Sequence, residues 1–334
     1  MLRTSGAEKV DSGRSESRRR FIARLGRTAI AAGGANISFW PAGLLAQEDS
    51  AASKSYPSHG PRKHWLENSR ELIAKLILPP PKGRRISDHL FVSTRLENVF
   101  YLNLGERAVL IDTGFDHQVD SHLDNFERLG CDLDKIAVIL ATHSHVDHTG
   151  GLKRAQQRLD VPIVAHRHAV EPIGKGDLLR TAAVIPELDG WRFEYPACEV
   201  DQTVDDRDVI QVDDERIVVL HIPGHNPDCL GYLWRQHFFT GDAVFGAGLI
   251  GWANERWLSN YQDHAESMKR LVASPPNAET FYCAHGPHLP YNSKVPNDCL
   301  KTLERLIQRE GDPCNHTPRT QRRNLSDSPR IRDL

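Results

Sequence analysis

From residue 86 onward, short apolar runs alternate with polar turns along the chain. Runs rich in β-branched and aromatic residues, bounded by turn residues, are typical of strands. The run Ile-Ala-Val-Ile-Leu at 136–140 has the composition of a buried strand. Further strands are expected at 90–92, 99–101, 108–111, 162–165, 217–220, 231–234, 238–239 and 280–283.

Helical spacing of apolar residues separates several of these runs. It predicts helices at 64–78, 119–129, 151–159, 257–273 and 298–309. Strands come first, they alternate with helices in the middle, and helices dominate the end. This order favours an α/β chain in which two mixed β-sheets pack face to face with helices outside.

Composition divides the chain into four segments. We expect residues 1–46 to be a signal segment, 47–85 a linker with an N-terminal helix, 86–310 the folded domain, and 311–334 a polar disordered tail. The sequence contains no internal repeat, and nothing in it indicates a second domain.

The N-terminal segment has the features of an export signal in their usual order. The sequence Ser-Arg-Arg-Arg-Phe-Ile at 17–22 resembles a twin-arginine signature, a weakly apolar stretch follows at 28–45, and Ala46 ends a small-residue cleavage site. This predicts export through the twin-arginine route to the periplasm or another extracytoplasmic space. Anchoring by an uncleaved signal is the alternative. After signal removal we expect no stable membrane span.

Charge is distributed unevenly along the chain. The net charge is −2, but residues 1–46 carry eight Lys+Arg and three Asp+Glu, which leaves 34 basic and 41 acidic residues, a net charge of −7, in the remainder. An acidic body is a poor partner for nucleic acid, whose binding depends on phosphate neutralisation. We therefore expect no nucleic-acid partner, although this overall charge is compatible with a local basic patch.

The richest motif is Thr-His-Ser-His-Val-Asp-His-Thr-Gly-Gly at 142–151. It follows the predicted strand at 136–140, and residues two apart in an extended segment share a face, so His143 and His145 point the same way. The turn that follows can direct Asp147 and His148 toward the same region. Four such side chains in six residues would repel one another without a cation, and they suit zinc, iron or manganese.

Other candidate ligands also follow apolar strands, in turns that contain Gly or Pro. His225 lies in Pro-Gly-His, Asp242 in Gly-Asp-Ala, and His285 in Ala-His-Gly-Pro. Upstream, Asp112 begins an Asp-Thr-Gly turn. Loops at strand ends are where rigid scaffolds display functional groups. The nearby histidines His166, His168, His221 and His288 are interpreted as surface or supporting groups rather than ligands.

Taken together, these five motifs resemble the metallo-β-lactamase superfamily, in the family's order and over roughly residues 86–310. The resemblance implies a four-layer αβ/βα sandwich and a binuclear metal-dependent hydrolase. It also implies two divalent ions bridged by a hydroxide, with zinc as the expected metal and manganese or iron as alternatives. One ion would be bound by three histidines, the second by one aspartate and two histidines, and one aspartate would bridge them. In that order the implied ligands are His143, His145 and His225; Asp147, His148 and His285; and Asp242.

The same resemblance assigns further roles. Asp147 and Asp242 would be the catalytic carboxylates, and Asp112 would hold a ligand histidine in its proper tautomer. True β-lactamases of this fold usually lack the bridging aspartate, so Asp242 favours the glyoxalase II, thioesterase or lactonase branches. The expected substrate is a small acyl compound with a thioester, ester or lactone carbonyl.

Aromatic residues after the bridging aspartate are candidates for substrate binding. Phe245, Trp252 and Tyr261 follow Asp242 in a succession similar to acyl-thioesterase-like members of the fold. The aromatic residues Trp191, Phe193 and Tyr195 are candidates for an opposite wall. If these residues line the mouth of the site, an apolar acyl group is favoured.

Three other functions stay open. A mononuclear iron persulfide dioxygenase would use His143, His225 and Asp242 and leave open positions for oxygen and substrate. A phosphodiesterase of the same fold is the second, and a non-catalytic metal carrier is the third. The oligomeric state is not predicted.

Overall fold

The computed structural model describes residues 80–185, 191–245, 249–251, 253–292 and 294–310. The predicted signal segment, the helix at 64–78, Trp252 and the C-terminal tail lie outside these residues. None of the described helices is both long and apolar enough to cross a membrane.

The first sheet has seven strands in the order β1-β2-β3-β4-β5-β6-β9. Its first four strands pair as antiparallel neighbours, and β4, β5, β6 and β9 are parallel. The strands are β1 (Lys82–Arg85), β2 (Leu90–Thr94), β3 (Asn98–Asn103), β4 (Ala108–Ile111), β5 (Ile136–Leu140), β6 (Ile163–His166) and β9 (Gln202–Val204).

The second sheet has six strands in sequence order, antiparallel except for the β13–β14 pair. Two short strands, β7 and β8, form a separate hairpin. The strands are β10 (Val209–Val212), β11 (Glu215–His221), β12 (Leu230–Trp234), β13 (His237–Gly241), β14 (Thr280–Cys283), β15 (Leu289–Pro290), β7 (Val184–Ile185) and β8 (Trp191–Arg192).

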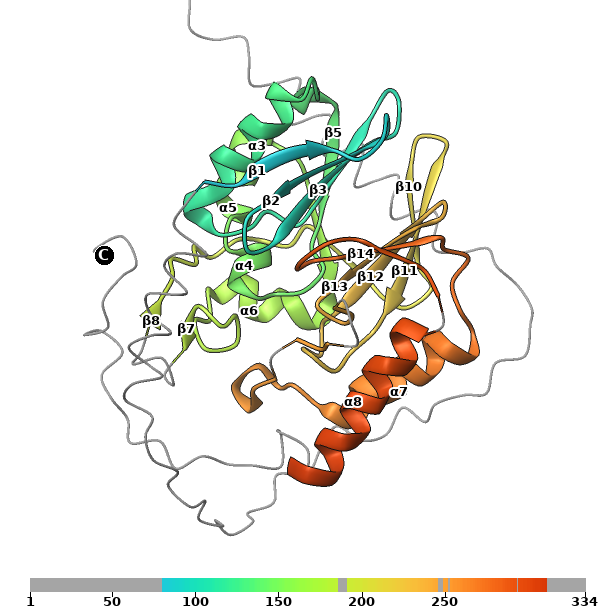
Figure 1. The fold of residues 1–334 in the computed structure, drawn as a ribbon. Helices are drawn as coiled ribbons and strands as arrows, with labels where there is room; N and C mark the ends of the chain where they lie inside the picture. Colours follow the sequence, from blue (N-terminus) through green and yellow to red (C-terminus); the bar gives the residue numbers. More distant parts are fainter. Residues whose placement is uncertain (1–79, 186–190, 246–248, 252, 293, 311–334) are drawn as a thin grey trace, which may run out of the picture.

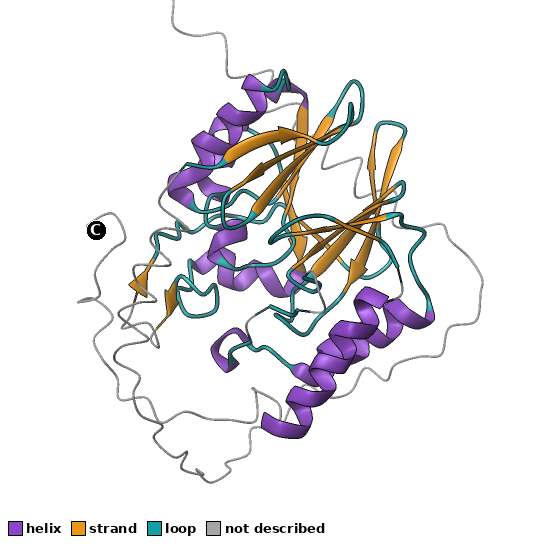
Figure 2. Ribbon diagram, in the orientation of Figure 1, coloured by secondary structure: helices purple, strands orange, loops and turns teal. Residues whose placement is uncertain are grey.

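Helices cover the outer face of each sheet (Figure 1). Figure 2 shows the resulting order of helix, strand, strand and helix layers. The helices are α3 (Val119–Arg128), α4 (Val146–Thr149), α5 (Leu152–Leu159), α6 (Val170–Lys175), α7 (Tyr261–Ala273) and α8 (Lys294–Glu310), with 3-10 turns η1 (Asp116–Gln118), η2 (Leu133–Lys135), η3 (Arg167–Ala169) and η6 (Glu255–Trp257).

The alternation of side chains between the two faces of each sheet explains the layers. In β2, Phe91 faces the core under α3 and α5, whereas Val92 faces the core between the sheets. In β13, Phe239 joins the core between the sheets, whereas Phe238 packs with α7 and α8. Adjacent strand residues point to opposite faces, so each sheet contributes to two cores. The predicted four-layer αβ/βα sandwich is confirmed.

Three differences from the sequence prediction go beyond small shifts at the ends of elements. The helix predicted from residue 257 begins at Tyr261, because Leu258 adopts a left-handed backbone with φ of 60° and Asn260 caps the helix through the backbone N–H of Asp263. The last helix begins earlier, at Lys294. Residues Lys82–Arg85, predicted as linker, form an edge strand of the first sheet.

Candidate metal centre

Five strands deliver the predicted site residues to one region of the sandwich. Asp112 follows β4, His143 follows β5, Asp242 follows β13 and His285 follows β14. His225 lies in the turn after β11. The parallel pairs β4–β5 and β13–β14 bring their carboxyl ends to a common edge of each sheet. Side chains predicted from separate motifs are therefore neighbours in space.

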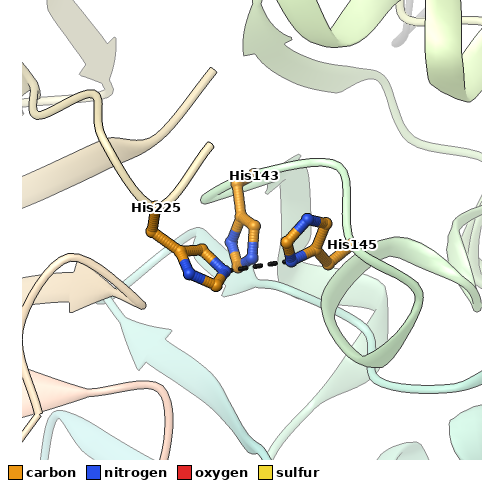
Figure 3. Close-up of side chains that lie close together, drawn as sticks. All are labelled: His143, His145 and His225. Atoms are coloured by element: carbon orange, nitrogen blue, oxygen red, sulfur yellow. Dashed lines mark hydrogen bonds between the residues drawn. The ribbon is translucent and has the colours of Figure 1, made fainter. Parts of the chain in front are cut away.

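Three histidines form the first group. Their ring centroids lie 4.6 Å (His143–His145), 4.7 Å (His145–His225) and 5.1 Å (His143–His225) apart. Nε2 of His225 lies 3.0 Å from Nδ1 of His145, the contact drawn as a dashed line in Figure 3. One ligand-type nitrogen of each ring lies within 4.8 Å of the other two. The three rings thus converge on one point, as a single cation requires.

Asp147, His148 and His285 form the second group. Oδ2 of Asp147 lies 3.5 Å from Nε2 of His148 and 3.3 Å from Nε2 of His285.

The carboxylate of Asp242 lies between the two groups. Its Oδ2 is 3.4 Å from Nε2 of His225 and 3.9 Å from Nε2 of His143. Its Oδ1 is 3.4 Å from Nε2 of His148 and 3.3 Å from Nε2 of His285. One oxygen faces each group, which is the arrangement that a bridging carboxylate needs.

The donor set fits two divalent cations. Nε2 of His143, Nε2 of His148 and Oδ1 of Asp242 are buried and have no hydrogen-bond partner among the described residues. Buried polar atoms without partners are costly, and a cation that accepts their lone pairs removes this cost. Imidazole and carboxylate groups are donors that zinc, manganese and iron all take. The ligand roles of all seven residues stay predictions.

Electrostatics favours the ligand forms of the first group. Burial, followed by the neighbouring histidines, lowers the pKa of His143 well below its ordinary value. Burial and His225 lower the pKa of His145 in the same way. Imidazole binds a metal only when it is deprotonated, so these rings are neutral and ready to bind.

In the second group, the charges of neighbouring side chains outweigh the effect of burial on the pKa values. Burial disfavours charge on His148, but Asp147 and Asp242 outweigh it and raise the pKa of His148 well above its ordinary value. Burial would likewise raise the pKa of Asp242, yet His285 and His148 hold it well below its usual range. Without a cation, protons on these rings compensate the buried carboxylates.

Contacts outside the groups orient the rings. Oδ2 of Asp112 lies 3.0 Å from Nδ1 of His148, and the two carboxylate oxygens accept hydrogen bonds from the backbone N–H and the hydroxyl of Thr142, both at 2.8 Å. Nδ1 of His285 contacts the carbonyl oxygen of Leu96 at 2.8 Å. Each contact leaves Nε2 facing the site. The position of Asp112 is the one expected of a group that selects a ligand's tautomer.

A cavity of about 410 Å³ opens at the two groups. Asp147 and Asp242 lie at its polar end, and most of its remaining wall is apolar. The Trp257 ring lies 4.8 Å from that of His145, and the Phe245 ring lies 5.2 Å from that of His285. The apolar wall residues are Leu96, Phe115, Val146, Ala182, Ile185, Phe193, Phe245 and Trp257.

The candidate substrate residues have different positions. Phe245 and Phe193 line the cavity. Tyr261 instead packs against the core cluster under α7 and α8, and it is absent from the cavity wall. Tyr195 is buried behind the site, where its hydroxyl contacts Thr149. Trp252 lies outside the described residues.

Sequence reasoning missed several wall residues. Phe115 directly follows the Asp-Thr-Gly turn, and this adjacency to a site motif was the available signal. Leu96 and Ile185 carry no such signal, because a turn between β2 and β3 and the β7–β8 hairpin bring them to the cavity. Gly251 was missed too: a Cβ there would lie 2.4 Å from Nδ1 of His225.

His166, Asp205 and His221 also bring three ligand-type atoms within 4.8 Å. However, Nδ1 of His166 accepts a hydrogen bond from the backbone N–H of His168, and Asp205 pairs with Arg167. A neutral ring that accepts at Nδ1 carries its proton on Nε2, the nitrogen facing Asp205. We assign no metal to this group. His166 is nevertheless fully buried, not a surface residue.

Comparisons with known proteins agree with this architecture. Acyl-coenzyme A thioesterase MBLAC2 of Homo sapiens is 27% identical over 206 residues, which cover 56% of this chain and 72% of the relative. A hydroxyacylglutathione hydrolase of Halorhodospira halophila is 28% identical over 205 residues, which cover 61% of this chain and 66% of the relative. The metallo-beta-lactamase GOB-18 of Elizabethkingia meningoseptica has a similar fold, with a TM-score of 0.56, 17% identity, and coverage of 78% of this chain and 100% of that chain.

The sequence pattern of one family covers the whole site. The pattern described as the metallo-beta-lactamase superfamily matches residues 93–285, more than half of the chain. This span runs from β2 to the last of the predicted ligands. The chain therefore belongs to the metallo-beta-lactamase superfamily.

Proposed function

We propose that this protein is a binuclear metal-dependent hydrolase that cleaves thioesters of an apolar acyl group. The main supporting observation is a set of seven convergent donors, five of which line a cavity whose wall is otherwise apolar. A buried apolar wall favours an acyl chain over a charged one. The similarity to an acyl-coenzyme A thioesterase and to a hydroxyacylglutathione hydrolase supports a thioester in preference to an ester or lactone.

The residues present would divide the work as follows. When bound, two divalent ions would supply an activated water and a Lewis acid for the carbonyl oxygen. The three histidines of the first group would hold one ion, Asp147, His148 and His285 the other, and Asp242 both. Asp147 lines the cavity and would accept a hydrogen bond from the attacking water. This hydrogen bond would orient the lone pair of the water toward the carbonyl carbon.

The apolar wall would position the substrate. Trp257 and Phe245 flank His145 and His285, so an acyl chain packed between them presents its carbonyl to the donors. Phe115 and Phe193, whose rings are 4.9 Å apart, form another part of the same wall. Burial of the chain there would exclude bulk water and hold the reacting atoms together.

The test is elemental analysis of the purified protein together with turnover of a chromogenic medium-chain thioester and a lactone. We expect about two zinc or manganese ions per chain and faster turnover of the thioester. Asp242→Asn should lower the rate by several orders of magnitude with little change in far-UV circular dichroism. Asp214→Ala, at an exposed turn position, is the matched control and should match the wild type.

Other outcomes would redirect the proposal. An unchanged rate in Asp242→Asn would refute the mechanism. About one iron per chain, no thioester turnover and oxygen uptake with a persulfide would instead favour the dioxygenase function of His143, His225 and Asp242.

A further inference from the structure

A second cavity, of about 570 Å³, lies beside the metal centre on the face of β1, β2 and β3 that carries Val92 and Phe100. The segment that follows His285 forms its other wall. The lining residues are Lys82, Gly83, Arg84, Ile86, Val92, Thr94, Arg95, Asn98, Phe100, Gly286, Pro287 and His288. We call this cavity the basic groove.

Strand register builds the floor of the basic groove. Lys82 pairs with Thr94, which pairs with Asn98, so these three side chains form one row across the sheet. Arg84, Val92 and Phe100 form the next row. Residues paired across neighbouring strands place their side chains on the same face. Two cationic side chains of one edge strand therefore stand at the ends of two adjacent rows.

The groove is cationic and its described lining residues include no carboxylate. Lys82, Arg84 and Arg95 line it together with His288. Burial and the nearby charge of Arg84 lower the pKa of His288. Like charges gathered in a concave site repel one another and attract an anion. This concentration of positive charge stands out because residues 47–334 have a net charge of −7.

The basic groove borders the metal centre. Leu96 lines the metal cavity and Arg95 the groove, and likewise His285 lines the first and Gly286 the second. The ridge between them is held by hydrogen bonds from Asn98 to the backbone oxygens of Ala284 at 2.7 Å and Gly286 at 2.8 Å. A ligand that reaches the donors can thus extend over this ridge.

We infer that the substrate is the thioester of a thiol that carries phosphate groups. The basic groove binds these phosphates while the acyl chain occupies the metal cavity. This inference rests on the proposed thioesterase function and deepens it. The two halves of such a substrate differ in chemistry as the two cavities do: an apolar chain on one side of the carbonyl and anionic phosphates on the other. Arginine and lysine are suited to phosphate recognition through charge-assisted hydrogen bonds.

The first experiment compares two thioesters with the same acyl group, acyl-coenzyme A and acyl-N-acetylcysteamine, which lacks phosphates. We expect Arg84→Glu in the metal-loaded full chain to lower the ratio of their kcat/KM values about tenfold or more, the effect of one charge-assisted contact. Arg84→Lys should recover most of the ratio.

Arg85→Glu is the matched control, because it makes the same charge change one residue along β1, where the guanidinium packs over Phe91 on the opposite face. The ratio should stay at the wild-type value. An equal fall in both variants, or no fall in Arg84→Glu, would overturn the inference.

A second experiment separates failure of the groove from failure of the proposed function. Calorimetry with desulfo-coenzyme A, which has the phosphates but no thioester, measures binding even if no substrate is turned over. Affinity should drop about tenfold in Arg84→Glu and be retained in Arg85→Glu. Equal affinity of the two variants would refute the groove assignment, as would strong binding of a single-stranded oligonucleotide with none of desulfo-coenzyme A.

Discussion

At the scale of single residues, the candidate metal centre depends on groups outside the set of predicted ligands. Asp112 has a φ of 61°, in the left-handed region, and this bend turns its carboxylate toward Thr142 and His148. Asparagine tolerates this backbone conformation, whereas alanine would be strained there. Asparagine is therefore the informative replacement.

We predict that Asp112→Asn lowers metal affinity about 10–100-fold, the range for outer contacts of metal ligands. The amide oxygen would accept the hydrogen bond from the backbone N–H of Thr142, so the NH2 group would face Nδ1 of His148 and could not accept a hydrogen bond from it. The tautomer with a free Nε2 is then no longer selected. Competition with a chromogenic chelator measures the change. Asp132→Asn, which changes a carboxylate that caps η2, should leave affinity unaltered; a similar loss in both variants would contradict the prediction.

A glycine makes room for the ring of one predicted ligand, His225. A Cβ on Gly251 would come within 2.4 Å of Nδ1 and 2.8 Å of Cε1 of His225. Real Cβ atoms do not approach this closely, so the ring would have to move. We predict that Gly251→Ala reduces the metal content of the first group and lowers the hydrolytic rate, with a small change in Tm.

The control for this prediction is Gly174→Ala, because a Cβ at Gly174 meets nothing within 4 Å. Elemental analysis after dialysis should give full metal content in Gly174→Ala and reduced content in Gly251→Ala. Full metal content and full activity in Gly251→Ala would show that His225 does not bind the metal in this orientation.

At the scale of elements, a buried tyrosine supports the loop that carries the central motif. The Tyr195 hydroxyl lies 2.8 Å from Oγ1 of Thr149 and 3.1 Å from the backbone oxygen of Ser144. Removal of a buried hydrogen bond costs about 1–1.5 kcal/mol. We expect Tyr195→Phe to lower the free energy of unfolding by this amount and to weaken metal binding as well, because Ser144 lies between two predicted ligands.

Tyr101→Phe separates these two effects. The Tyr101 hydroxyl donates to the backbone oxygen of Asp132 at 2.8 Å, in a separate loop. Urea titration should give a similar stability loss in both variants, but chelator competition should show weaker metal binding in Tyr195→Phe alone. Equal metal affinity in the two variants would restrict Tyr195 to a structural role.

The strands also show where prediction from the local sequence pattern succeeds and where it fails. The strands of the central motifs were predicted because each is a dense apolar run between turn residues, as at Ile136–Leu140. Strand β1 was not predicted, because Lys-Gly-Arg-Arg contains no apolar residue. It is the edge of its sheet, and exposed charges are common on edge strands, where they discourage pairing with other chains.

At the scale of the whole molecule, metal binding should be coupled to stability. The predicted ligands come from both sheets and are brought together only in the folded chain. A ligand that binds only the folded state stabilises it by about 2.7 kcal/mol per site at a free concentration of 100 times Kd. We therefore expect Tm to rise by several degrees with added zinc and to fall with EDTA.

Asp242→Asn provides the comparison for this prediction, since its side chain contacts both groups. Differential scanning calorimetry should show a smaller zinc-dependent rise in Tm for this variant than for the wild type. A Tm that is the same with zinc and with EDTA in the wild type would contradict coupling between the site and the fold.

The sequence by itself determined the fold class and the predicted metal-binding residues. Each motif is a contiguous strand and turn, and four ligand-type side chains in the six residues from His143 to His148 have few uses other than cation binding. The apolar strands and the cluster of ligand-type side chains each lie within one continuous stretch of the sequence. They could therefore be predicted without knowing which residues are in contact in the folded chain.

Tertiary structure decided the shape of the metal cavity and the existence of the basic groove. Leu96, Ile185 and Trp257 line the same cavity although they come from three segments that are distant in the sequence. Lys82 and Arg84 face the segment after His285 only because of strand register and the alternation of side chains along β1. Such surfaces consist of single residues from separate segments, and only packing of the whole chain brings them together.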